Sequence, residues 1–239
     1  MNRLYQKNEL LFAIMWIIIY VIAFSMGDSL SASVGVEKSV TVIVGGVLTA
    51  ILALWLYQNG HSADYGLCPS KVSASRLLYY LPLILLASVN LWFGVTLNLT
   101  PLETGLYIIS MFFVGFLEEI IFRGLLFKAM AKDNLQTAII VSSVTFGLGH
   151  IINLFNGSGA DLLSSGLQVV YAIAAGFMFT VLFCKTKSLW ACIITHGCLN
   201  ALSVFANEGV QTPLMEVGSA AVLTVVAVVY GWYIWKKVE

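Results

Sequence analysis

Charge is scarce in this sequence. Of 239 residues, 12 are Lys or Arg and 12 are Asp or Glu, together 10% of the chain, whereas 59% are hydrophobic. Soluble globular domains carry about 25% charged residues, and proteins that bind nucleic acid present a basic surface. The composition therefore excludes a soluble domain and predicts no nucleic-acid partner. With a mean hydropathy of +0.92, it indicates an integral membrane protein.

Cysteine and metal-binding patterns are equally sparse. The four cysteines, Cys68, Cys184, Cys192 and Cys198, lack the spacing of metal ligands, and two of them fall beside predicted cytoplasmic loops, where thiols stay reduced. The chain contains no His-Glu-x-x-His helix, internal repeat or low-complexity tract. We therefore expect neither a disulfide framework nor a repeat architecture.

Long apolar runs, by contrast, are abundant. A helix needs about 20 apolar residues to cross a bilayer, and eight runs approach that length. They cover residues 10–27, 39–57, 77–97, 105–130, 136–153, 167–184, 189–206 and 217–235. The sequence thus predicts an all-α, polytopic membrane protein with about eight transmembrane helices in a single domain, residues 1–239.

Basic residues flank these runs on one side. They precede the first run, follow the last, and lie between runs two and three, four and five, and six and seven. They are Arg3, Lys7, Lys71, Arg76, Lys128, Lys132, Lys185, Lys187, Lys236 and Lys237. The opposite connections hold Lys38 among acidic residues. The positive-inside rule therefore places both termini in the cytoplasm.

Two adjacent carboxylates and an arginine lie inside the fourth run, in the order Glu118-Glu119-Ile-Ile-Phe-Arg123. A charge near the bilayer centre costs at least about 2.5 kcal/mol on insertion scales, so these residues are candidates for a functional site. Residues four apart share a helix face, so Glu119 can pair with Arg123 while Glu118 points elsewhere and is available as a general base. The alternative is a structural ion pair beside one more acid in a polar cleft.

Two further motifs supply imidazole groups. Phe146-Gly-Leu-Gly-His150 lies near the end of the fifth run, and its two glycines would permit close helix approach. His196-Gly-Cys-Leu-Asn200 lies in the seventh run, where the spacing of four places two donors on one face, as a developing oxyanion requires. Each motif taken alone could instead tie helices together through hydrogen bonds.

The depths of these groups do not match in straight, upright helices. At the usual helical rise, Glu118 lies about 18 Å, His196 about 10 Å and His150 more than about 20 Å from the cytoplasmic end of its helix. A common site therefore requires tilt, a kink or a later start of the fifth run. The first, second and last runs hold few reactive side chains, so we expect them to serve as scaffold. The stretch Asn156–Asp161 is either a substrate entrance or a plain connection.

Together, the three motifs resemble those of the CAAX prenyl endopeptidase and bacteriocin-processing family of intramembrane proteases (CPBP, or Abi). The family motifs Glu-Glu-x-x-x-Arg, Phe-x-x-x-His and His-x-x-x-Asn or Asp correspond in order to the three motifs above. They fall within residues 105–206, which we interpret as the catalytic core. The resemblance implies an all-helical membrane endopeptidase whose cavity is reached from the membrane and the cytoplasm.

The resemblance also implies roles for six residues. These are Glu118, Glu119, Arg123, His150, His196 and Asn200. Glu118 and His150 would activate water, His196 and Asn200 would hold the oxyanion, and the Glu119–Arg123 pair would support them. We expect a mechanism without a cofactor. The alternative is one zinc ion held by Glu118, His150 and His196 as a His2Glu set.

The expected partners are a membrane-associated peptide or protein substrate and the lipid bilayer, and the expected location is a bacterial plasma membrane. A first alternative is a non-catalytic membrane immunity or scaffold protein of the same fold. A second is a proton-coupled transporter in which Glu118, Glu119 and His150 relay protons. The absence of paired interrupted helices does not favour the transporter.

Overall fold

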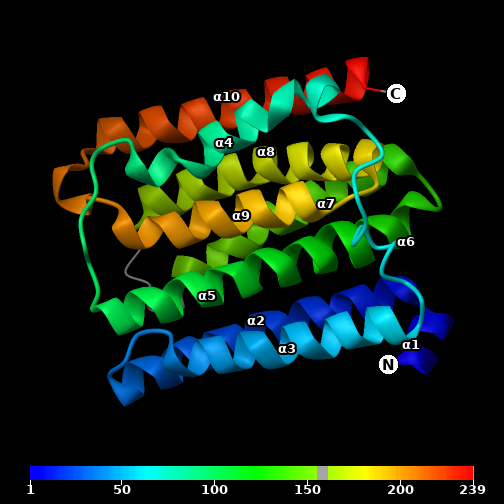
Figure 1. The fold of residues 1–239 in the computed structure, drawn as a ribbon, viewed down its shortest axis with the longest axis horizontal. Coiled ribbons are helices and arrows are strands. Elements are labelled where there is room, and N and C mark those ends of the chain that lie inside the picture. The colour runs from blue at the N-terminus through cyan, green and yellow to red at the C-terminus, as the bar shows by residue number, and fades with distance from the viewer. Residues whose placement is uncertain (155–160, 239) are drawn as a thin grey trace.

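The computed structural model describes residues 1–154 and 161–238, and within them every regular element is helical (Figure 1). Six helical segments of this part of the chain are long and apolar enough to cross a membrane. They are α2 (Glu9–Val34), α3 (Ser39–Gln58), the continuous helix Pro101–Ala131, the helix Leu135–Ile152, α8 (Leu162–Thr186) and α10 (Pro213–Lys237). The short helix α1 (Asn2–Lys7) precedes them. The predicted all-α, polytopic membrane fold is confirmed.

Two of the eight predicted spans form shorter helices. The run 77–97 folds as the segment Ala74–Ala87, which ends in α4 (Leu81–Ala87), and the run 189–206 folds as Trp190–Phe205, which contains α9 (Trp190–Leu202). Left-handed backbone at residues 78–80 interrupts the first segment. Beyond Gly94, with φ of 99°, the chain bonds to the end of the second segment. Apolar composition could not separate such short helices from full spans, because both are buried among apolar neighbours.

The helix that carries both glutamates has a sharply defined start and an irregular middle. Thr100 and Glu103 form a capping box, and Pro101 occupies the first turn of α5 (Pro101–Glu118). The π-helical segment η3 (Glu119–Phe127) follows, and α6 (Lys128–Ala131) completes the helix. All nine residues of η3 are buried. Wider π turns recur at functional sites, and this one lies in the interior of the bundle.

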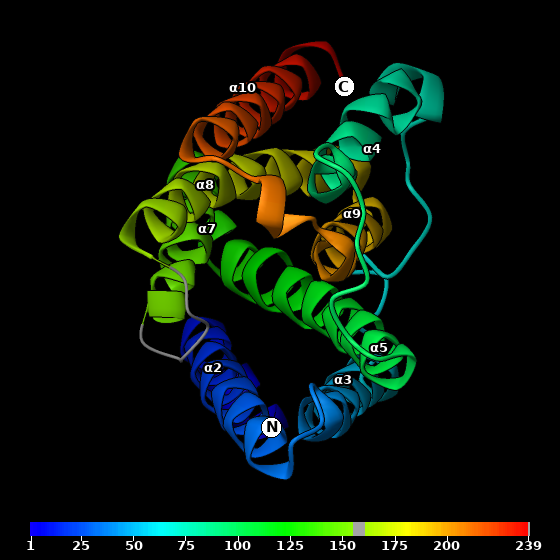
Figure 2. The same ribbon diagram turned by 90° about the vertical axis from the view of Figure 1, so that its left-hand side faces the viewer.

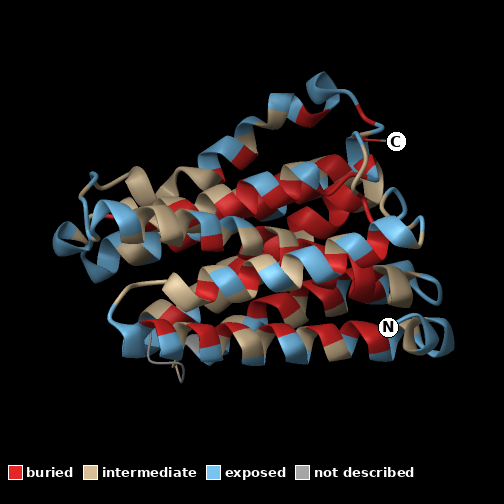
Figure 3. Cartoon of the chain, turned by 60° about the horizontal axis from the view of Figure 1, so that its bottom comes forward, coloured by how far each residue is buried: buried red, intermediate tan, exposed pale blue. Residues whose placement is uncertain are grey.

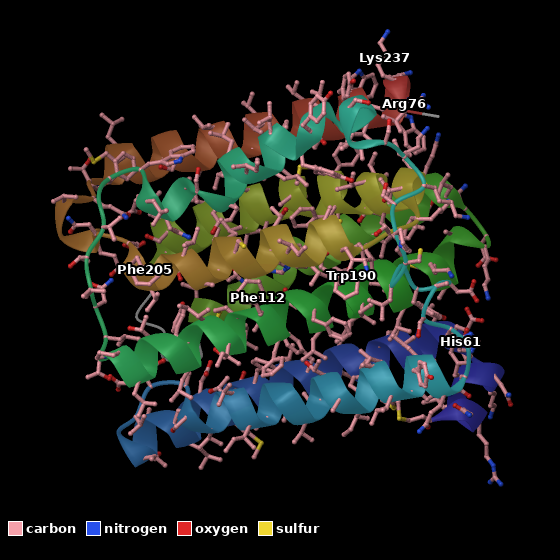
Figure 4. The ribbon with its side chains drawn as sticks, in the orientation of Figure 1. His61, Arg76, Phe112, Trp190, Phe205 and Lys237 are labelled. Carbon is pink, nitrogen blue, oxygen red and sulfur yellow. The ribbon has the colours of Figure 1, made fainter. Side chains whose placement is uncertain are left out.

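Both chain termini lie at one end of the bundle, which we call the terminal end; the opposite end is the distal end (Figure 1). At the terminal end, Lys132 Nζ donates to Glu9 Oε1 at 2.6 Å. Arg76 Nη2 donates to the carbonyl of Lys237 at 3.5 Å, and Figure 4 shows these two residues beside the C-terminus. The basic segments predicted to share one side thus gather at one end. The side of the membrane that this end faces stays a prediction.

Of the stretch suggested as a substrate entrance, residues 156–160 lie outside the described residues. Asp161, its last residue, is the N-cap of α8 and accepts a hydrogen bond from the Ser164 backbone N–H at 2.8 Å. That bond lowers the pKa of the Asp161 carboxyl below its usual value. This carboxylate therefore caps the N-terminus of α8 at the distal end.

Many large apolar side chains are exposed on the outside of the bundle. The buried residues lie in its interior (Figure 3). Ile22 on α2, Ile43 on α3 and Val229 on α10 keep 54%, 64% and 62% of their surface exposed. Exposing such surfaces to water is unfavourable, whereas contact with lipid chains is not. The distribution is that expected of helices that face a bilayer.

Candidate active site

The two adjacent glutamates point into different environments. Glu118 ends α5 and keeps 13% of its side chain exposed, whereas Glu119 begins η3 and is completely buried. The change from α-helical to π-helical winding occurs between them. The predicted division of roles between the two acids therefore has a structural basis in the local backbone.

Glu119, Arg123 and His196 form a cluster that we call the buried triad. Glu119 Oε1 accepts hydrogen bonds from Arg123 Nη1 at 3.1 Å and from His196 Nδ1 at 2.9 Å. The completely buried Arg123 guanidinium stacks on the Phe146 ring, with Cζ 3.9 Å from its centroid. The predicted Glu119–Arg123 pair is confirmed. Each charge stabilises the other, because an unpaired charge in the protein interior would destabilise the folded state.

Glu118 is held by two other side chains. Its Oε1 accepts a hydrogen bond from the Tyr20 hydroxyl at 2.5 Å, and its Oε2 lies 3.7 Å from His196 Nε2. His196 thus stands between the two glutamates. Tyr20 belongs to α2, so the first span, expected from the sequence to be scaffold, contributes a side chain to the candidate site.

His150 begins the 3-10 segment η4 (His150–Leu154), directly after α7 (Leu135–Gly149). Its Nδ1 lies 3.1 Å from the carbonyl oxygen of Phe146. A carbonyl can only accept a hydrogen bond, so Nδ1 carries the proton and the neutral ring offers Nε2 as an acceptor. This tautomer suits a residue that orients water.

A cavity of about 380 Å³ brings the cavity-facing candidates together. Glu118, His150 and Asn200 line it, whereas the buried triad does not. Further polar lining comes from Tyr20, Ser25, Asp28, Lys38, Asn90, Tyr107, Gln168 and Ser203. The six predicted site residues therefore form two connected sets, three at the cavity and three behind it. The cavity lies in the distal half of the bundle.

His196 and Glu119 lie at the same depth because the turns that join successive helices lie at different depths in the bundle. In Figure 1 the turn between α8 and α9 lies nearer the middle of the bundle than the turn between α6 and α7. Consequently His196, in the second turn of α9, reaches the level of Glu119 deep in its own helix. The later start considered from the sequence concerned the fifth run instead, and that run begins at Leu135 as α7, close to its expected start.

Glycines allow the helices that carry the triad to approach closely. A Cβ atom on Gly115 of α5 would lie 2.8 Å from the Gly197 backbone nitrogen, and one on Gly197 would lie 2.6 Å from Phe112 Cδ1. Figure 4 shows Phe112 between α5 and α9. Gly147 plays the predicted role between α7 and α8, because a Cβ there would lie 2.3 Å from Ile173 Cγ1. The same prediction for Gly149 is not borne out among residues 1–154 and 161–238, where a Cβ at that position would meet nothing within 4 Å.

We expect Gly115→Ala to lower the free energy of unfolding by about 1–3 kcal/mol, because the new methyl group would press against the backbone of α9. Gly105→Ala, on the same helix, is the matched control, since a Cβ at Gly105 meets no described atom within 4 Å. This control should be neutral or slightly stabilising because alanine favours helix. Thermal unfolding in one detergent measures both. Equal melting temperatures for the two variants would contradict the close contact.

Among the described residues, no group of three His, Cys, Asp or Glu side chains is placed to hold a metal ion. Within the alternative zinc set, His196 Nε2 lies 3.7 Å from Glu118 Oε2, and His196 Nδ1 is bonded to Glu119, which lies outside that set. Whether the protein uses a cofactor stays a prediction.

Sequence reasoning missed several residues that shape the cavity. Asn90 Nδ2 donates to the Leu199 carbonyl at 2.6 Å, and the Tyr107 hydroxyl lies 2.8 Å from Ser203 Oγ. These contacts fix α9 and the segment after it, which carry Asn200. The available signal was an isolated polar residue within an apolar run.

Comparison with known proteins supports the family resemblance. Residues 100–202 match the family described as type II CAAX prenyl endopeptidase Rce1-like, and all three motifs lie within that segment. A segment of 98 residues is 36% identical to "Putative membrane peptidase YdiL" of Bacillus subtilis (strain 168). The aligned part covers 41% of this chain and 35% of that protein, so the chain matches about a third of the relative's length. The family resemblance drawn from the motifs is confirmed.

Proposed function

We propose that this chain, whose residues 100–202 match the Rce1-like family, is an intramembrane endopeptidase that hydrolyses a peptide bond in a membrane-associated peptide or protein. The observation that carries the proposal is the position of Glu118. Its carboxylate faces a cavity, is oriented by Tyr20, and shares the cavity wall with His150 and Asn200. A general base requires this combination of fixed orientation and space for water.

In the proposed reaction, Glu118 takes a proton from a water molecule that His150 Nε2 helps to orient. The water oxygen attacks the carbonyl carbon, and the electron pair of the carbonyl bond moves to its oxygen. The Asn200 carboxamide donates a hydrogen bond to this oxyanion, a contribution typically worth about 2.7–4 kcal/mol of barrier. The intermediate then expels the amide nitrogen, which receives the proton from Glu118. The products are a carboxylic acid and an amine.

The proposal gives His196 a positioning role. The resemblance implied that His196 and Asn200 together hold the oxyanion, but the His196 side chain is only 4% exposed and both ring nitrogens face glutamates. In this role, His196 links Glu118 to the Glu119–Arg123 pair and keeps the base in place. Asn200 is then the oxyanion donor that substrate meets directly.

The direct test is cleavage of a quenched fluorescent peptide library by the protein purified in detergent, with and without a strong chelator. A Glu118→Gln preparation controls for contaminating peptidases. We expect cleavage that survives the chelator and that places one ¹⁸O atom from labelled water in the new carboxyl group. Chelator-sensitive cleavage restored by zinc would favour the zinc alternative. A folded protein that cleaves no peptide would favour the immunity or scaffold alternative.

We expect Tyr20→Phe to lower kcat about tenfold, because it removes a hydrogen bond of roughly 1.5–3 kcal/mol to a charged group. Tyr57→Phe is the matched control, since Tyr57 lies on α3 with 77% of its surface exposed. Steady-state kinetics on one peptide measure both variants. An unchanged kcat in Tyr20→Phe would show that the hydroxyl does not orient the base.

The multi-pass fold makes the chain an integral membrane protein. We further propose a bacterial plasma membrane as its location, in line with the bacterial relative. Fractionation of the source cells would test this, with the protein expected in the membrane fraction that also holds respiratory enzymes.

A further inference from the structure

The cavity extends from the centre of the bundle toward the distal end. On α2 its lining runs from Tyr20 to Asp28, and on α5 it runs from Glu118 back to Tyr107, in both cases in the distal direction. The lining residues of α9 and the segment after it are Leu199, Asn200 and Ser203, at the distal end of that segment. Figure 2 faces the distal end and shows α2, α5, α7 and α9 around its centre. Substrate arriving from this end would meet Glu118 at the bottom of the cavity.

In the terminal half, by contrast, the hollows of about 480 and 750 Å³ have no lining residue in common with the cavity, and packed side chains lie between Glu118 and that end. An aromatic cluster, which we call the aromatic plug, consists of Tyr5, Phe12, Trp55, His61 and Tyr65. The rings of Phe12 and Trp55 lie 4.8 Å apart, and those of Tyr5 and Trp55 lie 5.0 Å apart. Figure 4 shows His61 at the terminal end. The plug lies on the same side of Glu118 as the fully buried segment η3.

The loop that follows α3 closes this half further. The Gly66 carbonyl accepts from Leu189 N at 2.9 Å, and Lys71 N donates to the Thr186 carbonyl at 2.9 Å. A Cβ atom on Gly66 would lie 2.7 Å from Phe183 Cε2. Lys128 Nζ also donates to the carbonyl of Asp64 in this loop. The loop is therefore fastened to the ends of α6, α8 and α9, and no lining residue of the cavity belongs to it.

The distribution of charge indicates which side of the membrane each end faces. Of the 12 Lys and Arg residues, Arg123 is buried at the site and Lys38 lies at the distal end. The remaining ones belong to the segments gathered at the terminal end. The positive-inside rule places such an end in the cytoplasm, so among the described residues the cavity extends toward the outer side.

We infer that the site receives its substrate from the distal end, outside the cytoplasm, and that its substrates are peptide segments exposed at the outer face of the membrane. This inference rests on the proposed function and differs from the cytoplasmic access that the family resemblance implies. At the cavity wall near the distal end, Lys38 Nζ is bonded to Asp28 at 2.8 Å. Glu37 Oε1 also lies 3.8 Å from this Nζ, so carboxylates offset the Lys38 charge and the polar lining there does not favour an anionic substrate group.

The first test is independent of activity. Single cysteines are introduced at Ser25, in the cavity, and at Ser75, exposed at the terminal end, in a chain whose native cysteines are replaced by alanine. A membrane-impermeant maleimide is applied to intact cells and to inverted vesicles. We expect Ser25→Cys to be labelled in intact cells and Ser75→Cys only in inverted vesicles. Labelling of both from the same side would overturn the inference.

The second test uses the wild-type chain in liposomes, so it does not depend on the cysteine variants folding. Vesicles are sorted by the accessibility of a C-terminal affinity tag, and an impermeant quenched peptide is added outside. Vesicles with the termini inside should hydrolyse the peptide, whereas those with the termini outside should do so only after detergent is added. The reverse pattern would overturn the inference. Absence of cleavage everywhere, including in detergent, would instead overturn the proposed function, while the labelling still decides the side of access.

Discussion

Glu118→Gln is expected to lower kcat by about 10²–10⁴-fold while leaving the fold intact, since general acid–base catalysis contributes a factor of that size. The carboxamide has the shape of the carboxylate, and its oxygen can still accept the hydrogen bond from Tyr20. It cannot take a proton from water. The loss should therefore appear in kcat and not in the melting temperature.

The matched control for this prediction is Glu208→Gln, which removes an exposed carboxylate in a short distal turn. Steady-state kinetics and thermal unfolding in the same detergent measure both variants. If Glu118→Gln kept more than about a tenth of the wild-type rate, another group would have to act as the base. A protein with only a scaffold function would tolerate both changes equally.

Arg123→Met is expected to lower the free energy of unfolding by about 3–5 kcal/mol, the usual cost of leaving one member of a buried ion pair behind. Methionine fills much of the same volume against Phe146 and Phe179, so lost packing is the smaller effect. Glu119 would keep only His196 as a hydrogen-bond partner. Denaturant unfolding in a fixed detergent measures the difference.

The double variant Glu119→Gln, Arg123→Met separates charge from packing. Because it removes both charges, it should recover most of the stability that the single variant loses. Arg76→Met, at the exposed terminal end, is the control and should stay within about 0.5 kcal/mol of the wild type. A double variant as unstable as Arg123→Met would show that the guanidinium acts mainly through its aromatic contacts.

Local spacing made part of the site predictable. Glu119 and Arg123 are four residues apart, and that separation alone brings them together on one helix, without help from the rest of the fold. The rarity of charge within an apolar run drew attention to the same residues. The pairing of His196 with Glu119 could not be predicted in this way, because these two residues belong to different helices and meet through the close contact of Gly115 with Gly197.

Tyr20 and the shortened segment Ala74–Ala87 illustrate what sequence patterns miss. A tyrosine in an apolar span is ordinary, and only the distance of 2.5 Å to Glu118 makes it part of the site. The run 77–97 is as apolar as its neighbours, yet left-handed residues divide it. Such features depend on contacts between distant parts of the chain, which composition does not contain.

The sequence by itself determined the membrane class, the helical fold, the three motifs and the gathering of basic segments on one side. Each of these follows from local composition or from spacing along one helix. Only the tertiary structure decided that Glu118, His150 and Asn200 line one cavity while His196 turns to the glutamates behind it. It also placed that cavity in the distal half, because the direction in which a buried space opens depends on how the helices pack against one another.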